Sequence, residues 1–367
     1  MQPNDTMPCT AKAQFLRDVV KPPRESGIEL LRIMAMLFII AHHLVYNSGL
    51  SESFDYTHPS ANLIWLQWIG AWGKTAINAF VIITGYFMCT SSLTARKFLK
   101  LLFQVVFYLV VIFLIFLSFG HEVATPRRLF ELAGHFFRGI NNGFTVSFLW
   151  FYLGIPFYNI LIRHCSKREL LLLIGLLLLH FSGAATLFAA KYSFNHTFWY
   201  MTIYFIGAYV RLYPMPWMSR NRVCLPSLLG CVCFASVWML INDWLKAGGM
   251  KVNLQYWLIS DSDKILAVSI GMLCFLVFRN LRIGYSKVIN TIASTTFGVL
   301  LIHANSDAMR QWLWKDLLNV PGFACYPFMT LIGKSLVCVI GVFIVCSLID
   351  LLRIKYVEKY VMKSFGL

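Results

Sequence analysis

The chain has 367 residues, of which 58% are hydrophobic and only 13% charged, and its formal net charge is +16. Soluble globular proteins are about 25% charged, so this composition excludes an ordinary soluble enzyme. It equally excludes a disordered, collagen-like or disulfide-stapled chain. What remains is a polytopic α-helical membrane protein.

Ten apolar segments follow one another along the chain. A bilayer core requires about 20 apolar residues in each spanning helix. Segments of about this length lie near 28–47, 65–89, 101–120, 145–162, 169–188, 197–213, 224–245, 262–279, 289–305 and 329–352. We therefore expect an all-α membrane bundle of about ten transmembrane helices.

The distribution of Lys and Arg predicts how the bundle is oriented. With ten spans, both termini and the even-numbered loops share one side, and that side carries more than twice as many Lys and Arg residues as the other. The positive-inside rule then places both termini in the cytoplasm. We expect a cytoplasmic segment over 1–27, a membrane domain over 28–352 and a cytoplasmic tail over 353–367. Because the cations cluster between hydrophobic segments, they indicate topology, and no nucleic-acid partner is expected.

Ionisable residues lie within the first segment, where a charge costs roughly 2.5–3.5 kcal/mol at mid-membrane. Glu29 and Arg32 are one helical turn apart and can pair. Arg32 and His43 are separated by almost three full turns, so they share a face and lie about 16 Å apart. This polar stripe favours a functional site. The alternatives are an interfacial anchor for the Glu–Arg pair and a helix–helix hydrogen bond for the histidine.

Other segments offer further candidates. Lys74 lies near the outer mouth of the second segment and His303 near the outer end of the ninth. A histidine in the outer half could act as a general base because it titrates near neutrality. The cytoplasmic cluster of Arg96, Lys97 and Lys100 could hold anionic lipid headgroups or the phosphates of a cofactor. No Cys/His spacing typical of zinc occurs, and no metal is expected.

Six short segments, in one order, resemble those of a known family. They are Glu29-Leu-Leu-Arg32 with His43, AFVIITGYFM (79–88), the basic cluster at 96–100, LWFYL (149–153), YFIGAYV (204–210) and FGVLLIH (297–303). The family they resemble is acyltransferase family 3, integral membrane proteins that acylate extracytoplasmic carbohydrates. The chain departs from the family pattern at Val81 and Thr84, which stand for Phe and Ser, and at Leu300, which stands for Tyr.

The resemblance implies a reaction and a location. An acyl group, usually acetyl, would move from cytoplasmic acyl-CoA to a hydroxyl of a cell-surface polysaccharide or its lipid-linked precursor. The enzyme would be a multi-pass protein of the bacterial cytoplasmic membrane, in contact with lipids and with glycan-assembly proteins as partners.

The resemblance also implies roles for residues. His43, Arg32 and Glu29 would be catalytic, and Arg96, Lys97 and Lys100 would bind the CoA phosphates. Acyl transfer needs a base, which His43 supplies, and positive charge or hydrogen-bond donors near the developing oxyanion. Lys74 or Trp150 could provide the latter, and His303 joins them as a substrate-binding candidate.

Two other functions compete with the acyltransferase reading. Intramembrane His, Arg and Glu residues also form proton relays, so a transporter or flippase for a sugar-lipid or a small anion is the main alternative. The inverted repeats and broken helices of many transporters are not evident in the sequence. A scaffold subunit of a glycan-synthesis complex is the third possibility. Incubation of the purified protein with labelled acetyl-CoA distinguishes these functions, because only an enzyme consumes acetyl-CoA or becomes labelled.

Overall fold

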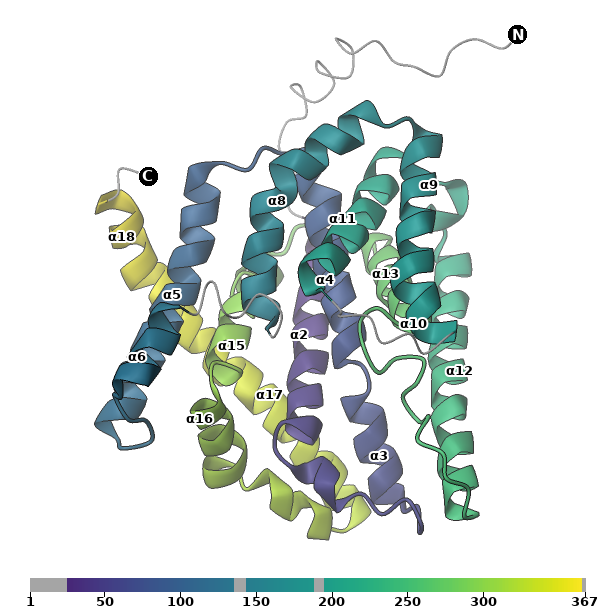
Figure 1. Ribbon diagram of the computed structural model, residues 1–367, viewed down its shortest axis with the longest axis vertical. Helices are drawn as coiled ribbons and strands as arrows, with labels where there is room; N and C mark the ends of the chain where they lie inside the picture. The colour runs from purple at the N-terminus through teal and green to yellow at the C-terminus, as the bar shows by residue number, and fades with distance from the viewer. Residues whose placement is uncertain (1–24, 135–142, 188–194, 365–367) are drawn as a thin grey trace.

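The computed structural model describes residues 25–134, 143–187 and 195–364, and within these ranges every regular element is helical (Figure 1). The longer helices are α2 (Ser26–Tyr46), α5 (Ala95–Ser118), α8 (Phe144–His164), α12 (Asn221–Ala247) and α17 (Phe328–Leu352). Intermediate lengths are found for α3 (Ala61–Gly70), α4 (Gly73–Met88), α9 (Lys167–Leu178), α11 (His196–Leu212) and α13 (Ile265–Arg279). The expected all-α class is confirmed.

Short helical elements complete the chain. They are η1 (Leu50–Ser53), α6 (Pro126–Ala133), η3 (Leu179–Gly183), α10 (Ala184–Leu187), η4 (Pro216–Ser219), α14 (Lys287–Ala293), α15 (Thr296–His303), α16 (Asp307–Arg310), η5 (Gln311–Leu317), η6 (Val320–Cys325), η7 (Arg353–Glu358) and α18 (Lys359–Ser364). Helix therefore continues past the expected domain boundary at 352. The expected N-terminal segment falls almost wholly outside the described residues.

Each of the ten expected segments has a helical counterpart, but several are interrupted. Segment 65–89 is split into α3 and α4, and segment 289–305 into α14 and α15. Among the described residues, six helices are long and apolar enough to cross a membrane, or seven if the pair formed by Lys287–His303 and Asp307–Leu317, bent by 97°, is one span. The count of ten and the cytoplasmic placement of both ends stay predictions.

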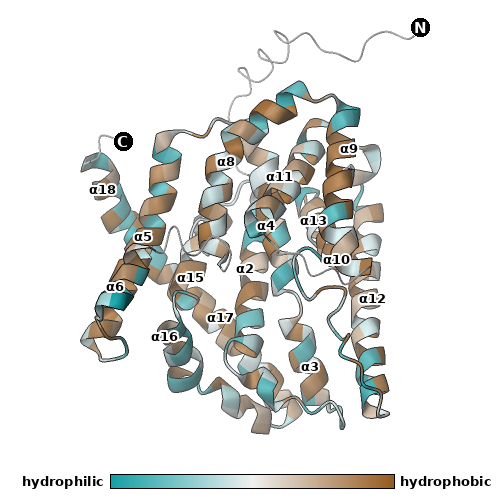
Figure 2. Cartoon of the chain, in the orientation of Figure 1, coloured by the Kyte–Doolittle hydropathy of each residue, from teal (hydrophilic) through white to brown (hydrophobic). Residues whose placement is uncertain are grey.

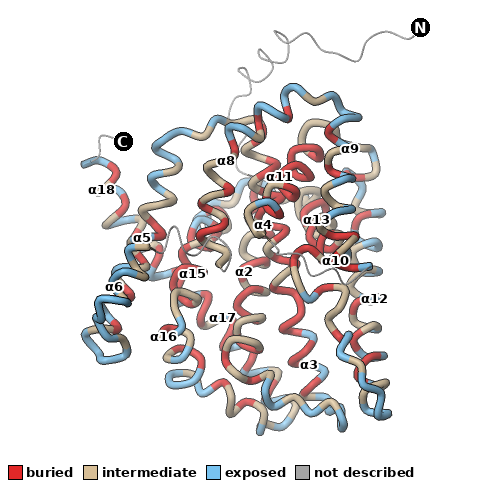
Figure 3. The backbone as a smooth tube through the Cα atoms, viewed as in Figure 1, coloured by how far each residue is buried: buried red, intermediate tan, exposed pale blue. Residues whose placement is uncertain are grey.

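The peripheral helices are apolar and exposed on the faces that point away from the bundle core. Leu172 and Leu176 on α9, Phe234 on α12 and Val337 on α17 are each more than half exposed. Comparison of Figures 2 and 3 shows hydrophobic positions along these outer helices where burial is low. Apolar surface of this extent is stable against lipid chains and costly in water. The chain is therefore a multi-pass membrane protein.

Helix α2 lies at the centre of the bundle, packed against α3, α4, α13, α14, α15 and α17. Its neighbour α4 also packs against α11, and the two helices meet at Gly85 and Gly207. A Cβ atom on Gly85 would overlap the backbone of Tyr204, and one on Gly207 would overlap the carbonyl of Ile82. Glycine permits this distance because it has no side chain. Both glycines belong to the segments that resemble the acyltransferase family.

Candidate active site

The bundle core contains a pair of histidines from two different helices. His43 Nδ1, on α2, lies 3.0 Å from His303 Nε2, on α15. His303 is completely buried, whereas His43 is partly exposed. The sequence placed both residues in the outer half of the membrane, and the structure joins them although 260 residues separate them.

The backbone fixes how protons are arranged in this pair. His303 Nδ1 lies 2.6 Å from the carbonyl oxygen of Val299, one turn earlier on α15. A carbonyl only accepts, so Nδ1 of His303 carries the proton and Nε2 of the neutral ring accepts. His43 must then donate through Nδ1, which leaves the lone pair of its ring on Nε2. The pair therefore presents a defined basic nitrogen, His43 Nε2, on the partly exposed ring.

Cationic side chains surround the two histidines. Lys74 on α4 and Arg310 on α16 both lie within electrostatic range of His43. Lys74 Nζ is 3.6 Å from Asp261 Oδ1, and Arg310 forms an ion pair with Asp307. Positive groups in such positions could stabilise an oxyanion that forms beside His43.

His42 points away from His43 and binds a neighbouring helix. Its Nδ1 donates to the carbonyl oxygen of Gly70 on α3, at 2.7 Å. A Cβ on Gly73 would overlap the imidazole of His42, so α4 begins in contact with this ring. The two adjacent histidines thus make different contacts. His42 contacts α3 and α4, whereas His43 faces His303.

A buried ion pair near the start of α15 holds that helix in place. Asp350 on α17 is completely buried, and its Oδ1 accepts hydrogen bonds from Arg353 Nε at 2.7 Å and from the Tyr108 hydroxyl at 2.7 Å. The Asp350 carboxylate lies against Gly298, so closely that any side chain at 298 would overlap it. A carboxylate beside the first turn of a helix also interacts favourably with the helix dipole.

The predicted pair of Glu29 and Arg32 forms at the opposite end of α2. Glu29 Oε2 lies 3.5 Å from Arg32 Nε, and Arg32 keeps 31% of its side chain exposed. Between Arg32 and His43 the shared face of α2 carries Met36 and Ile39, which are both buried. The structure therefore shows two polar sites on one face, separated by an apolar stretch.

The basic cluster lies at the start of α5, with its three cations exposed. Lys97 Nζ donates to Ser91 Oγ and to the carbonyl of Ser92, each at 2.7 Å. Lys100 Nζ is 2.6 Å from Glu358 Oε1 in η7. Two of the three cations thus have partners within the chain. A bound phosphate would share these two cations with their partners or would displace the partners.

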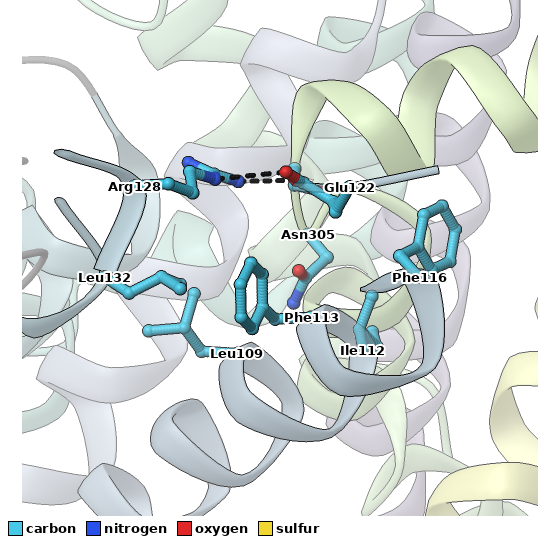
Figure 4. Close-up of a pocket in the computed structure, with 9 residues that line it drawn as sticks. Leu109, Ile112, Phe113, Phe116, Glu122, Arg128, Leu132 and Asn305 are labelled. Atoms are coloured by element: carbon cyan, nitrogen blue, oxygen red, sulfur yellow. Dashed lines mark hydrogen bonds and ion pairs between the residues drawn. The ribbon is translucent and has the colours of Figure 1, made fainter. Parts of the chain in front are cut away.

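The remaining predicted residue, Trp150, is partly exposed on α8, a helix that packs mainly against α11 and α5. Two residues beyond His303, Asn305 lines a cavity of about 10 Å³, room for one water. Figure 4 shows this cavity beneath the ion pair between Arg128 and Glu122. The hairpin formed by α5 and α6 therefore covers the chain immediately after His303.

Sequence reasoning missed Arg310 and Trp314 at this site. The ring of Trp314 is fully buried, 6.4 Å from that of His303 and edge-on to it. Both residues follow the bend after α15, and no periodic pattern carries across a bend, so no sequence signal linked them to His43. Among the described residues, no three His, Cys, Asp or Glu side chains form a group that could hold a metal ion.

The fold and the histidine pair define a helical membrane protein with an internal basic site. Comparison with known families specifies the class, because the acyltransferase family 3 model, described as an acyltransferase domain, matches residues 25–351. The chain belongs to this family and is a membrane acyltransferase. No curated protein and no solved structure matches the chain.

Proposed function

We propose that this protein transfers an acyl group, acetyl in the first instance, from cytoplasmic acyl-CoA to a hydroxyl of an extracytoplasmic carbohydrate. The proposal rests on one observation above all, the hydrogen bond that links His43 to His303 and so leaves His43 Nε2 as a base. We further propose the bacterial cytoplasmic membrane as its location, with cell-surface polysaccharide or its lipid-linked precursor as acceptor.

The reaction would proceed at His43 Nε2. This nitrogen accepts the proton of the acceptor hydroxyl while the hydroxyl oxygen attacks the thioester carbonyl carbon. The carbon–sulfur bond then breaks, the carbonyl reforms as an ester, and the thiolate of CoA takes up the proton held by His43. Lys74 and Arg310, both near His43, would stabilise the negative charge on the carbonyl oxygen of the intermediate.

The donor would enter from the opposite side of the membrane. Arg96, Lys97 and Lys100 supply positive charge at the start of α5, and cations of this kind bind phosphates through charge-assisted hydrogen bonds. Arg32 would guide the acyl-thioester arm from this end toward His43. That arm must pass Met36 and Ile39, whose apolar side chains suit an acyl chain and not a free ion.

A transfer assay tests the proposal. It combines the purified protein with radiolabelled acetyl-CoA and with surface polysaccharide from which mild base has removed the ester groups. We expect label to move to the polysaccharide, and His43→Ala to abolish transfer while the protein still inserts and accumulates normally. His58→Ala, at an exposed outer loop, is the matched control and keeps its activity. Full transfer by His43→Ala would remove His43 from the chemistry, and no transfer by the wild type would reject these substrates.

A further inference from the structure

A second group of polar side chains lies just outside the histidine pair. It comprises Tyr46 at the end of α2, Gln67 on α3, Asp243 near the end of α12, and Gln255 with Tyr256 in the segment before α13. We call these five residues the outer polar cluster. Four separate parts of the chain contribute to it, so only the folded bundle brings them together.

The cluster contains more hydrogen-bonding groups than it uses. Gln67, Asp243 and Gln255 are each at least 95% buried, and Gln67 Nε2 donates to Asp243 Oδ1 at 3.1 Å. The other carboxylate oxygen of Asp243 interacts with the Gln255 side chain, and the hydroxyls of Tyr46 and Tyr256 interact with each other, but none of these groups makes a hydrogen bond of good geometry within the described residues. Each such buried group costs about 1–3 kcal/mol, and native proteins seldom leave several in one place.

The cluster adjoins the proposed reaction centre. Tyr46 follows His43 by three residues, one helical turn farther toward the outer end of α2. The ring centroids of Tyr46 and His42 are 4.7 Å apart, and those of His42 and His43 are 5.9 Å apart. Tyr256 stands edge-on to Tyr46, with its centroid 5.9 Å away. A molecule held against Tyr46 would therefore lie within one helical turn of His43.

The chemistry of the cluster suits a neutral sugar. Sugar hydroxyls both donate and accept, so they can pair with a carboxylate oxygen, an amide nitrogen and phenol groups at once. The faces of Tyr46 and Tyr256 offer apolar surface for the C–H groups of a sugar ring. Burial raises the pKa of Tyr256 far above its ordinary value, so its hydroxyl stays a donor.

The charge of the cluster selects against other ligands. No cation forms an ion pair with Asp243 in the part of the chain that the structure describes, and Lys246 is directed to Asn253 and to the ring of Tyr56 instead. Lys246 acts on Asp243 only at longer range. An anionic ligand would therefore meet a carboxylate that has no ion-pair partner among the described residues, and an apolar ligand would leave the buried polar groups without partners. A polyhydroxylated neutral molecule satisfies them.

We propose that the outer polar cluster is the acceptor subsite, where a neutral sugar residue binds so that one of its hydroxyls reaches His43. This inference rests on the proposed function, whose acceptor it places at named residues. The cluster would set which sugar is acylated, while the histidine pair carries out the transfer.

Two measurements on the full-length protein in detergent or lipid discs test the subsite. The first is equilibrium binding of labelled, base-treated surface polysaccharide in the absence of any donor. The second is transfer from acetyl-CoA with each substrate varied in turn. The variants are Asp243→Asn and Tyr256→Phe, which keep the shape of the side chain, and the matched controls are Asp55→Asn in an exposed outer loop and Tyr360→Phe on α18.

We expect Asp243→Asn and Tyr256→Phe to weaken polysaccharide binding, and to raise its KM, by about tenfold or more, because each removes a hydrogen bond to the sugar. The KM for acetyl-CoA should stay within about twofold of the wild type, whereas a general distortion of the bundle would change the KM of both substrates. Unchanged polysaccharide binding in both variants, or an equal loss for both substrates, would overturn the subsite. If the wild type binds polysaccharide through these residues but transfers nothing to it, the subsite stands and the proposed function fails.

Discussion

The carboxylate of Asp350 occupies the space into which a side chain at Gly298 would project. Gly298 belongs to the short helix that ends in His303, and Asp350 is held on α17 by Arg353 and Tyr108. The position of His303 beside His43 therefore depends on a glycine and a buried ion pair near the other end of α15. This dependence can be tested without substituting either histidine.

Gly298→Ala should lower transfer by about 10²-fold, because a shift of roughly 1 Å in a catalytic group has that effect. The new methyl group would displace α15 from Asp350 and draw His303 away from His43. Gly341→Ala is the matched control, since a Cβ at 341 on α17 meets nothing within 4 Å in the structure. The activity of both variants is measured as the initial rate of label transfer. Equal rates for Gly298→Ala and the wild type would contradict this account of how α15 is positioned.

Substitution of His303 tests the proton arrangement of the pair. His303→Ala removes the group that accepts from His43 Nδ1, so His43 no longer has a fixed tautomer, and kcat should fall by about 10²–10⁴-fold. His303→Gln should recover part of the rate, because its amide oxygen can accept the same hydrogen bond. The KM for acetyl-CoA should change little in either variant. Wild-type kcat in His303→Ala would show that His43 needs no partner.

The ion pair between Lys100 and Glu358 predicts an unusual effect on donor binding at the end of the bundle that carries the basic cluster. If Lys100 binds donor phosphates, Glu358 competes with them for the same ammonium group at 2.6 Å. Glu358 Oε2 also accepts from Arg353 Nη1 at 2.7 Å, a hydrogen bond that the amide oxygen of glutamine can keep. Glu358→Gln should then lower the KM for acetyl-CoA by about two- to fivefold, and Lys100→Gln should raise it, as expected for a partly exposed ion pair. Steady-state kinetics with varied acetyl-CoA provide the measurement, with Lys363→Gln on α18 as control. An unchanged KM for acetyl-CoA in both variants would assign the basic cluster to lipid or topology instead.

Asp263 predicts a pH dependence of stability. This residue lies just before α13, where burial raises the pKa of its carboxyl group to about 6 and Asp261 adds to the effect. The folded protein therefore holds this proton more tightly than the unfolded chain, so stability is lost as pH rises from about 4 to about 6. Asp263→Asn should raise the thermal unfolding midpoint at about pH 8 and leave it unchanged at about pH 4.

Asp55→Asn serves as the comparison for that experiment. Asp55 is exposed in the loop between η1 and α3, and hydrogen bonds from Thr57 lower its pKa to about 2, so its ionised form is favoured in the folded state. Its replacement should not raise the midpoint at any pH. A gain for both variants at about pH 8 would mean that the removal of any carboxylate charge, and not the burial of Asp263, governs stability.

The sequence by itself determined that the chain is a helical membrane protein of the acyltransferase type. Long apolar segments and sparse charge follow from the bilayer, which imposes them locally on every spanning helix. Glu29, Arg32 and His43 could be placed on one face because helical periodicity relates residues within a single helix. Six short segments in order were enough to predict the family, and the match over residues 25–351 confirms it.

Only the tertiary structure decided what those residues contact. The hydrogen bond between His43 and His303, the approach of Arg310 after the bend, and the contact of Gly298 with Asp350 all join parts of the chain far apart in sequence. The outer polar cluster has the same character, because Asp243 and Gln255 resemble ordinary loop-end residues until α12 and α3 pack together. Periodicity describes each helix by itself, whereas the partner that a side chain meets depends on which helices become neighbours.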